Sequence, residues 1–206
     1  MWFEELAAPY YVFKDKGYEV VVASIQGGDP PVDGGSLQGD FVKPEECQRA
    51  LKDEAFQKDK KATIPVADLK AVDFEGVYLS GGHGACWDFV GEPAKDLVTF
   101  LETMWSQGKA VGAVCHGVVG LFDAKSGGEP LVKGKKVTGF SDTEEAAVQL
   151  TEVVPFLVEG KFKELGAVYE KGGDWAANVV QDGKLFTGQN PGSSKKLAEA
   201  MLGAMA

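Results

Sequence analysis

The alternation of helix and strand signals along this chain predicts a doubly wound α/β domain, with a mostly parallel sheet and helices on both faces. Short apolar runs rich in Val are separated by amphipathic stretches of helical period. No repeat or linker-like stretch divides the 206 residues, and a hydrophobic content of 44% suffices for one sizeable core. We therefore expect residues 1–206 to form a single domain.

In the N-terminal half, the expected order is helix, strand, loop, cap and strand. Leu6, Tyr10 and Phe13 recur at helical spacing within residues 4–16, and a glycine follows. The Val-rich run 18–24 predicts a strand, and the Gly-, Pro- and Asp-dense stretch 27–36 predicts a loop. Residues 39–61 are charged and weakly helical, which predicts a helical excursion or cap over the sheet. The run 74–79 predicts the next strand.

In the C-terminal half, a helix over 94–107 leads into a strand that ends at Cys115. Strands near 136–138 and 185–187 and a final helix over 194–205 complete the predicted pattern. Ligands of such sheets bind at the carboxyl ends of the strands, where the turns 81–84 and 115–117 both lie. These two turns therefore mark the expected site.

The apolar run 110–114 stops abruptly at Cys115-His116-Gly117, which predicts an active-site elbow. A strand followed by a sharp turn and a helix presents the turn residue to substrate. The helix N-terminus and the imidazole of His116 would both favour the thiolate, which is the nucleophilic form of cysteine. We expect Cys115 to be that nucleophile; the alternative is an inert, buried cysteine at a strand end.

Charge and cysteine usage narrow the class of protein. The formal net charge is −10 with no long basic cluster, which argues against nucleic acid or an anionic membrane surface as partner. Three scattered cysteines are too few for a disulfide framework and lack the spacing of a metal site, so we expect no metal. No apolar run has the length of a membrane span, and the first residues do not form a signal sequence. We expect a reducing, cytoplasmic location.

Five segments in order resemble the ThiJ/PfpI superfamily, which has a class I glutamine amidotransferase-like fold. They are 2–10 (WFEELAAPY), 81–84 (GGHG), 113–117 (AVCHG), 138–145 (TGFSDTEE) and 187–191 (TGQNP). Within it they are most similar to the heat-shock chaperone-like, glutathione-independent glyoxalases, or glyoxalase III proteins. The resemblance implies a flavodoxin-like sandwich, a homodimer, and a Cys-His-Glu site without metal or organic cofactor.

The resemblance also implies roles for single residues. Glu5 matches the carboxylate beside the reactive thiol, where a protonated glutamate hydrogen-bonds the thiolate and shuttles protons. His116 is the expected general base, oriented by Glu145 or, as the alternative, by Asp142.

Further residues would surround the thiol. The backbone N–H groups of Gly82 and His116 would form an oxyanion pocket. His83 and Trp87 would line the pocket or serve a structural role. Cys86 would form a regulatory disulfide with Cys115 or, as we favour, be buried as a small apolar residue. Cys47 is assigned no role.

One departure from the family pattern concerns the first strand. Family members have a β-strand before the helix that carries the glutamate, whereas this sequence begins at Met1-Trp2. Either the chain is truncated or the sheet compensates, and a missing central strand would leave unpaired edges on its neighbours. The pairing of these edges therefore bears on the stability and the activity of the chain.

Three functions follow from the resemblance. The leading one is a glyoxalase that converts methylglyoxal, a small 2-oxoaldehyde, to D-lactate, which makes it a D-lactate dehydratase of the lyase class. The others are a stress-response chaperone that holds unfolded clients, and a cysteine hydrolase or deglycase that acts on peptides or glycated adducts. Only the glyoxalase needs both Glu5 and Cys115 in one compact site.

Overall fold

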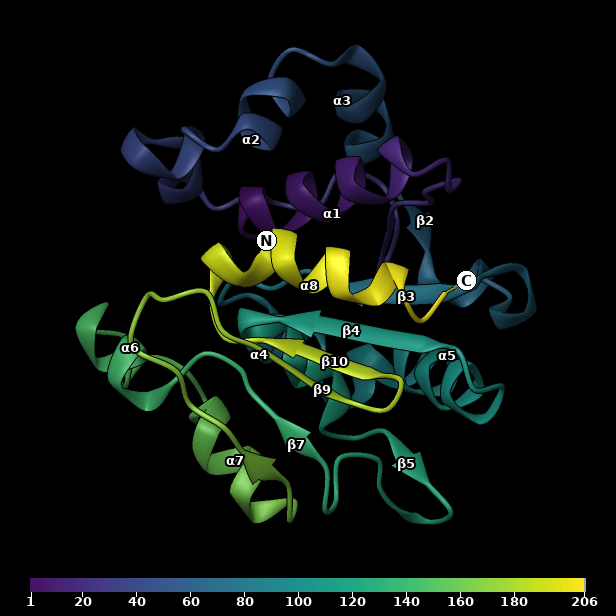
Figure 1. Cartoon of the computed structure of the whole chain (residues 1–206), viewed down its shortest axis with the longest axis vertical. Helices are drawn as coiled ribbons and strands as arrows, with labels where there is room; N and C mark the ends of the chain where they lie inside the picture. The colour runs from purple at the N-terminus through teal and green to yellow at the C-terminus, as the bar shows by residue number, and fades with distance from the viewer. Residues whose placement is uncertain (206) are drawn as a thin grey trace.

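The computed structural model describes residues 1–205, and a four-stranded sheet of order β3-β4-β10-β9 lies at its centre (Figure 1). The strands β3 (Gly76–Leu79), β4 (Ala110–Val114) and β10 (Leu185–Gly188) are parallel. The edge strand β9 (Val179–Asp182) pairs antiparallel with β10. The predicted mostly parallel α/β sheet is confirmed.

Helices cover both faces of the sheet because the buried residues of β4 alternate between two cores. Val111 and Ala113 belong to the core beneath α5 (Lys95–Ser106), η6 (Cys115–Leu121) and α7 (Val158–Glu164). Ala110 and Val114 pack on the opposite face with α8 (Ser194–Leu202). Figure 1 shows α1 (Phe3–Asp15) lying across α8, which separates it from the sheet.

The region expected to form a cap is helical, with α2 (Glu45–Ala50) and α3 (Glu54–Lys61), but it covers α1 and not the sheet itself (Figure 1). Phe56 of α3 is fully buried against the rings of Tyr10 and Tyr11, with centroid distances of 5.0 and 5.9 Å. These aromatic residues give the cap a small core of its own, and α1 contributes to it.

The strand predicted over 18–24 is reduced to β1 (Ala23–Ser24). It pairs with β2 (Ile64–Pro65) in a separate two-stranded sheet, while β3 pairs along one edge only, with β4. A strand needs a neighbour to complete its ladder of hydrogen bonds. Val22 accepts a backbone hydrogen bond from the Ile64 N–H, but residues 18–21 belong to no sheet among the described residues.

The remaining elements surround the sheet. The segment near 136–138 forms β7 (Lys136–Val137), which pairs with β8 (Val168–Tyr169) beside the main sheet and not within it. The shorter elements are α4 (Ala85–Asp88), α6 (Asp142–Ala147), β5 (Lys125–Ser126), β6 (Glu129–Pro130) and the 3-10 turns η1 (Gly34–Leu37), η2 (Gly39–Val42), η3 (Val66–Asp68), η4 (Ala71–Asp73), η5 (Glu92–Ala94) and η7 (Pro191–Ser193). Within residues 1–205, no helix has the length and hydropathy required to cross a membrane.

Candidate active site

The elbow after β4 holds Cys115 in a strained backbone conformation. Its φ is +56°, a left-handed value that costs an L-residue about 1–2 kcal/mol. The segment that follows is the 3-10 helix η6 and not the α-helix expected from the sequence. Strain of this kind persists where the surroundings enforce it, and it marks sites of function. Cys115 is only 4% exposed, so its sulfur meets a confined space.

The glycine turn after β3 fits tightly against this elbow. A Cβ atom on Gly81 would lie 2.5 Å from the Gly117 nitrogen and 2.8 Å from Glu5 Oε2, so only glycine permits this approach. Gly82 has a φ of +95°, which also favours glycine. The backbone N–H groups of Gly82 and His116 both interact with Cys115 and lower the pKa of its thiol. The two donors predicted for an oxyanion pocket therefore converge on the sulfur.

Glu5 reaches the site from the first turns of α1 and is completely buried. Its Oε2 accepts a 2.6 Å hydrogen bond from the Gly81 N–H, while Oε1 has no hydrogen-bond partner among residues 1–205. Burial raises the pKa of Glu5 to about 8, against weaker opposing contributions from Cys115 and Gly81. Glu5 therefore holds a proton at neutral pH.

Cys115 and Glu5 are coupled because both acids are buried side by side. Burial raises the pKa of the Cys115 thiol well above its usual value, and the negative charge of Glu5 raises it further. The raised pKa of Cys115 differs from the readily ionised thiol expected from the sequence. That expectation was based on the helix N-terminus and the imidazole of His116, and it did not include burial. Two such acids cannot both ionise cheaply in one buried site. A Cys115 thiolate is thus stabilised only while Glu5 is protonated.

His116 lies between Cys115 and Glu145. Its Nδ1 is 3.3 Å from Cys115 Sγ, and its Nε2 is 2.7 Å from Glu145 Oε2. Burial opposes ionisation of Glu145, but hydrogen bonds from the two imidazoles lower its pKa to about 2. An ionised carboxylate can only accept hydrogen bonds, which assigns the proton of neutral His116 to Nε2. The lone pair on Nδ1 then faces the thiol, and burial lowers the pKa of His116.

Of the two acids considered as partners of His116, Glu145 makes the contact. Asp142 is the first residue of α6, and its backbone N–H lies 3.3 Å from Glu159 Oε2. Its Oδ1 is buried without a hydrogen-bond partner among the described residues. Glu145, three residues further along the helix, faces the imidazole.

His83 contacts Glu145 and not the sulfur. Its Nε2 is 2.8 Å from Glu145 Oε1, and its ring centroid is 4.1 Å from that of His116. The ligand-type atoms of these three residues lie within 4.8 Å of one another, a proximity that sequence spacing did not predict. Because both imidazole Nε2 atoms are hydrogen-bonded to the Glu145 carboxylate, we assign no metal to these three residues.

The other predicted residues lie further from these contacts. Trp87 is 48% exposed on α4, and its place in a substrate-binding wall stays a prediction. Cys86 and Cys47 are buried free thiols in different hydrophobic clusters. The structure thus joins Cys115, His116, Glu5 and Glu145 through direct contacts, with the Gly81–Gly82 turn beside them.

Sequence analysis missed Glu144, which anchors a segment over the site. Glu144 is completely buried and accepts hydrogen bonds from the Ser141 N–H at 3.0 Å, the Trp175 N–H at 2.8 Å and Asn190 Nδ2 at 2.9 Å. The Ser-x-x-Glu pattern at 141–144 is a capping box that the sequence already displays. The bonds to Trp175 and Asn190 come from distant segments and have no local signal.

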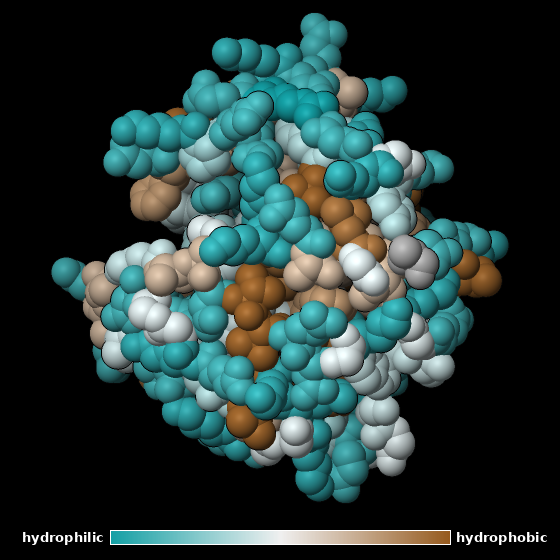
Figure 2. Space-filling view, in the orientation of Figure 1, coloured by the Kyte–Doolittle hydropathy of each residue, from teal (hydrophilic) through white to brown (hydrophobic). Residues whose placement is uncertain are grey.

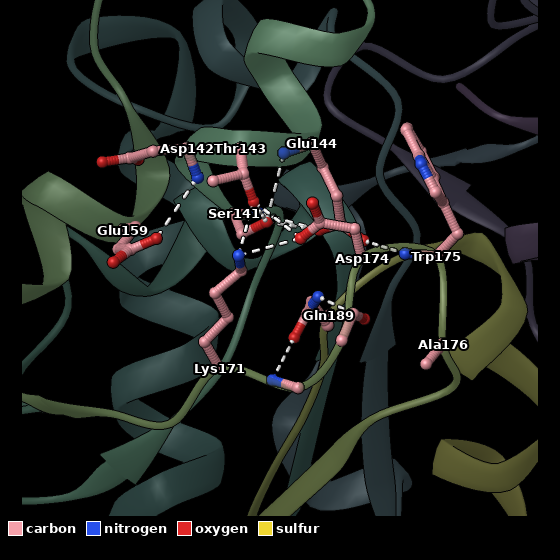
Figure 3. Close-up of polar contacts among 12 residues, drawn as sticks. Ser141, Asp142, Thr143, Glu144, Glu159, Lys171, Asp174, Trp175, Ala176 and Gln189 are labelled. Atoms are coloured by element: carbon pink, nitrogen blue, oxygen red, sulfur yellow. Dashed lines mark hydrogen bonds and ion pairs between the residues drawn. The ribbon is translucent and has the colours of Figure 1, made fainter.

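The segment 171–176, which we call the strap, lies beside the first residues of α6, where Asp174 is close to Thr143 (Figure 3). Asp174 binds Lys171 at 2.8 Å and accepts a 2.6 Å hydrogen bond from Thr143 Oγ1, and Gln189 Oε1 accepts one from the Gly172 N–H. Trp175 has a φ of +62° and is 53% exposed, and its side chain extends away from this network (Figure 3).

Aromatic contacts connect the strap to His116. The Trp175 and Phe140 rings are 5.9 Å apart, and the Phe140 and His116 rings 4.6 Å apart. The strap therefore lies next to the layer of rings that covers the imidazole.

A surface cavity lies away from this site. It has a volume of about 360 Å³ and lies between the start of α1, the 29–37 loop and the helical cap, with Phe3, Pro31 and Lys60 among its lining residues. None of the residues around Cys115 line it. Figure 2 shows a mostly hydrophilic face whose outline is indented between the cap and α6, on the side to which β4 and β10 point in Figure 1. Geometry around the nucleophile, and not cavity size, therefore defines the site.

The fold and the site define an α/β protein with a Cys-His-Glu arrangement at the carboxyl end of a parallel sheet. The DJ-1/PfpI family model matches residues 3–204, and the chain belongs to this family.

Several relatives and solved structures cover nearly the whole chain. "Glyoxalase 3" of Candida albicans is 35% identical across 97% of this chain and 87% of its own. "Glutathione-independent glyoxalase HSP31" of Saccharomyces cerevisiae is 32% identical across 98% and 87%. The crystal structure of glyoxalase III from Candida albicans matches with a TM-score of 0.90 at 33% identity, over 98% of this chain and 87% of that one. The X-ray structure of the 24 kDa Rapid Encystment Protein of Francisella tularensis matches with a TM-score of 0.93 at 32% identity, over 100% and 90%.

Proposed function

We propose that this protein is a glutathione-independent glyoxalase that converts methylglyoxal to D-lactate without a metal or an organic cofactor. The observation that carries the proposal is the contact of one buried thiol with two proton-handling groups, Glu5 on one side and His116 on the other. The relatives named glyoxalases support it, because they align over nearly the whole chain.

The reaction begins with a bond between sulfur and carbon. The Cys115 thiolate adds to the aldehyde carbon of methylglyoxal, and the former carbonyl oxygen takes a proton to give a thiohemiacetal. The N–H groups of Gly82 and His116, which interact with the sulfur, are near enough to stabilise the developing charge on that oxygen. Protonated Glu5 stabilises the thiolate before it attacks.

The next steps move a proton between the two carbons of the substrate. A base removes the hydrogen from the thiohemiacetal carbon, and the neighbouring carbonyl oxygen takes up a proton, which gives an enediol. Return of a proton to the second carbon, with loss of the hydroxyl proton from the first carbon, yields a lactyl thioester of Cys115. Water then attacks the thioester, which releases D-lactate and restores the thiol. Glu5 and the Nδ1 of His116 flank the sulfur and supply these proton transfers.

Burial of the nucleophile favours a small substrate over a protein one. Cys115 is 4% exposed and His116 is completely buried, which leaves little room for a peptide chain. This observation favours the glyoxalase over the hydrolase, whereas the holding activity of a chaperone would be independent of the thiol. The protein would act on free 2-oxoaldehydes in the cytoplasm, as a homodimer; size-exclusion chromatography with light scattering tests that assembly.

The deciding experiment is a D-lactate assay with methylglyoxal in the absence of glutathione and in the presence of a chelator. We expect D-lactate to accumulate in step with loss of methylglyoxal. Cys115→Ala serves as the matched control, because it removes one sulfur atom and should form no lactate. Absence of lactate from the folded wild-type protein would overturn the proposal.

A further inference from the structure

His83 shares a carboxylate with His116 although it does not touch the sulfur. Glu145 Oε2 is 2.7 Å from His116 Nε2, and Glu145 Oε1 is 2.8 Å from His83 Nε2. Each oxygen of one buried carboxylate thus has its own imidazole partner. The two rings lie 4.1 Å apart at an interplanar angle of 39°.

The two imidazoles differ in their access to water. The side chain of His116 is completely buried, whereas that of His83 is 23% exposed. His83 comes from the glycine turn after β3, and His116 from the elbow after β4. The shared Glu145 comes from α6, so three separate elements meet at this carboxylate.

We propose that His83 is a positioning residue that holds Glu145 in place and keeps His116 in its neutral, base-competent form as the pH falls. Two hydrogen bonds fix the orientation of the Glu145 carboxylate. A carboxylate held at both oxygens cannot rotate, so Oε2 stays aligned with His116 Nε2 and the free Nδ1 lone pair stays directed at Cys115.

The burial of His116 and the proximity of His83 both oppose a positive charge on His116. Burial lowers the pKa of His116, because charging a completely buried imidazole costs desolvation energy. The neighbouring His83 lowers the pKa of His116 further, because its ring lies 4.1 Å away and opposes a positive charge there. The other titratable groups that face this pair are Glu145 and Glu144 from α6, and Cys115 with Glu5 on the side of the sulfur. His116 therefore remains an unprotonated base to lower pH than it would without His83.

The test uses two substitutions at position 83. His83→Gln keeps an N–H donor for Glu145 but cannot become charged, whereas His83→Phe keeps a ring and loses both the donor and the charge. Because the chain has two histidines, either variant leaves His116 as the only imidazole. Its titration can be followed by NMR without any turnover.

We expect the pKa of His116 to be higher in both variants than in the wild type, by on the order of one unit. The acidic limb of the pH profile of kcat/KM for lactate formation should move upward by the same amount. On the alkaline side of that limb, His83→Gln should retain most of the activity. His83→Phe should lose roughly 10- to 100-fold because Glu145 is no longer held. Lys95→Gln, which removes a positive charge from an exposed ion pair with Glu92 at the start of α5, is the control and should leave the limb in place.

An unchanged NMR titration of His116 in both variants would overturn the inference. So would a loss of activity in His83→Gln without any shift of the limb, because that is the signature of a purely structural role. The kinetic part rests on the proposed function, but the NMR part does not. A shifted titration in a protein that forms no lactate would reject the glyoxalase and keep the role of His83.

Discussion

At the scale of single residues, burial determines the chemistry of Cys115 and Glu5. Both side chains lie out of solvent beside each other, and burial raises the pKa of each. When the pair holds one proton between them, the Cys115 thiolate can attack an aldehyde and protonated Glu5 can supply a proton to carbon. The two substitutions below test each member of this pair.

Replacing Cys115 with glycine and with alanine separates the role of the sulfur from the strain of the elbow. Both variants should form no lactate. Cys115→Gly should be more stable than Cys115→Ala by about 1 kcal/mol, because only glycine accepts a φ of +56° without cost. Thermal unfolding should show this as a difference in Tm of roughly 2–4 °C. Equal midpoints would show that the elbow is unstrained.

Replacing Glu5 with glutamine keeps a hydrogen-bond donor for Cys115 but removes a movable proton. Lactate formation should fall by a factor on the order of 10² or more, while alkylation of the thiol stays closer to the wild-type rate. Unchanged lactate formation would place the proton shuttle elsewhere, most directly on His116.

The same substitution should alter the pH dependence of stability. The folded-state pKa of Glu5 is about 8, above its ordinary value of 4.5, so the folded protein binds the extra proton between these pH values. Its stabilising contribution is complete below about pH 4.5 and is lost as the pH rises through about 8. Denaturant unfolding at pH 5 and pH 9 should therefore show a larger loss of stability in the wild type than in Glu5→Gln, by a few kcal/mol. Parallel losses would contradict the assignment.

At the scale of elements, α6 connects the catalytic carboxylate to the strap. Glu144 and Glu145 are adjacent on this short helix but serve different neighbours. Glu145 faces the two imidazoles, and Glu144 holds the backbone of Trp175 and the side chain of Asn190. A disturbance of the strap therefore reaches the helix that orients His116.

Glu144→Gln tests this connection. Both oxygens of the Glu144 carboxyl group accept hydrogen bonds from N–H groups. Glutamine would place an NH₂ donor where one oxygen accepts, so at least one buried N–H group would lose its partner, at a cost of about 1–3 kcal/mol in stability. Urea unfolding should show that loss, and kcat should fall because α6 shifts. Glu152→Gln changes an exposed glutamate and should have no effect. A Glu144→Gln protein of wild-type stability would show that the strap is not anchored there.

At the scale of the whole molecule, α1 links the cap to the sheet. It contributes Phe3, Tyr10 and Tyr11 to the core of the cap, and it also packs along α8, which covers the sheet. Glu5 is on the same helix, so the cap, the sheet and the site depend on one another.

We therefore expect residues 1–206 to unfold in one cooperative transition. Far-ultraviolet circular dichroism, which follows the helices, and tryptophan fluorescence should give the same midpoint in urea. The chelator used in the activity assay should leave this midpoint unchanged. Two separated transitions would show that the cap and the sheet are independent folding units.

The sequence by itself determined the α/β class, the elbow at Cys115 and the glycine turn that meets it, because these features are written in local periodicity and in the sharp change from an apolar run to a turn. Motif resemblance added Glu5, His116 and Glu145 as candidates. Only the tertiary structure decided that Glu145 and not Asp142 contacts His116, that His83 shares that carboxylate, and that the strand expected over 18–24 shrinks to Ala23–Ser24. These features depend on contacts between segments distant in the chain, and on the burial that such contacts create, so no local pattern encodes them.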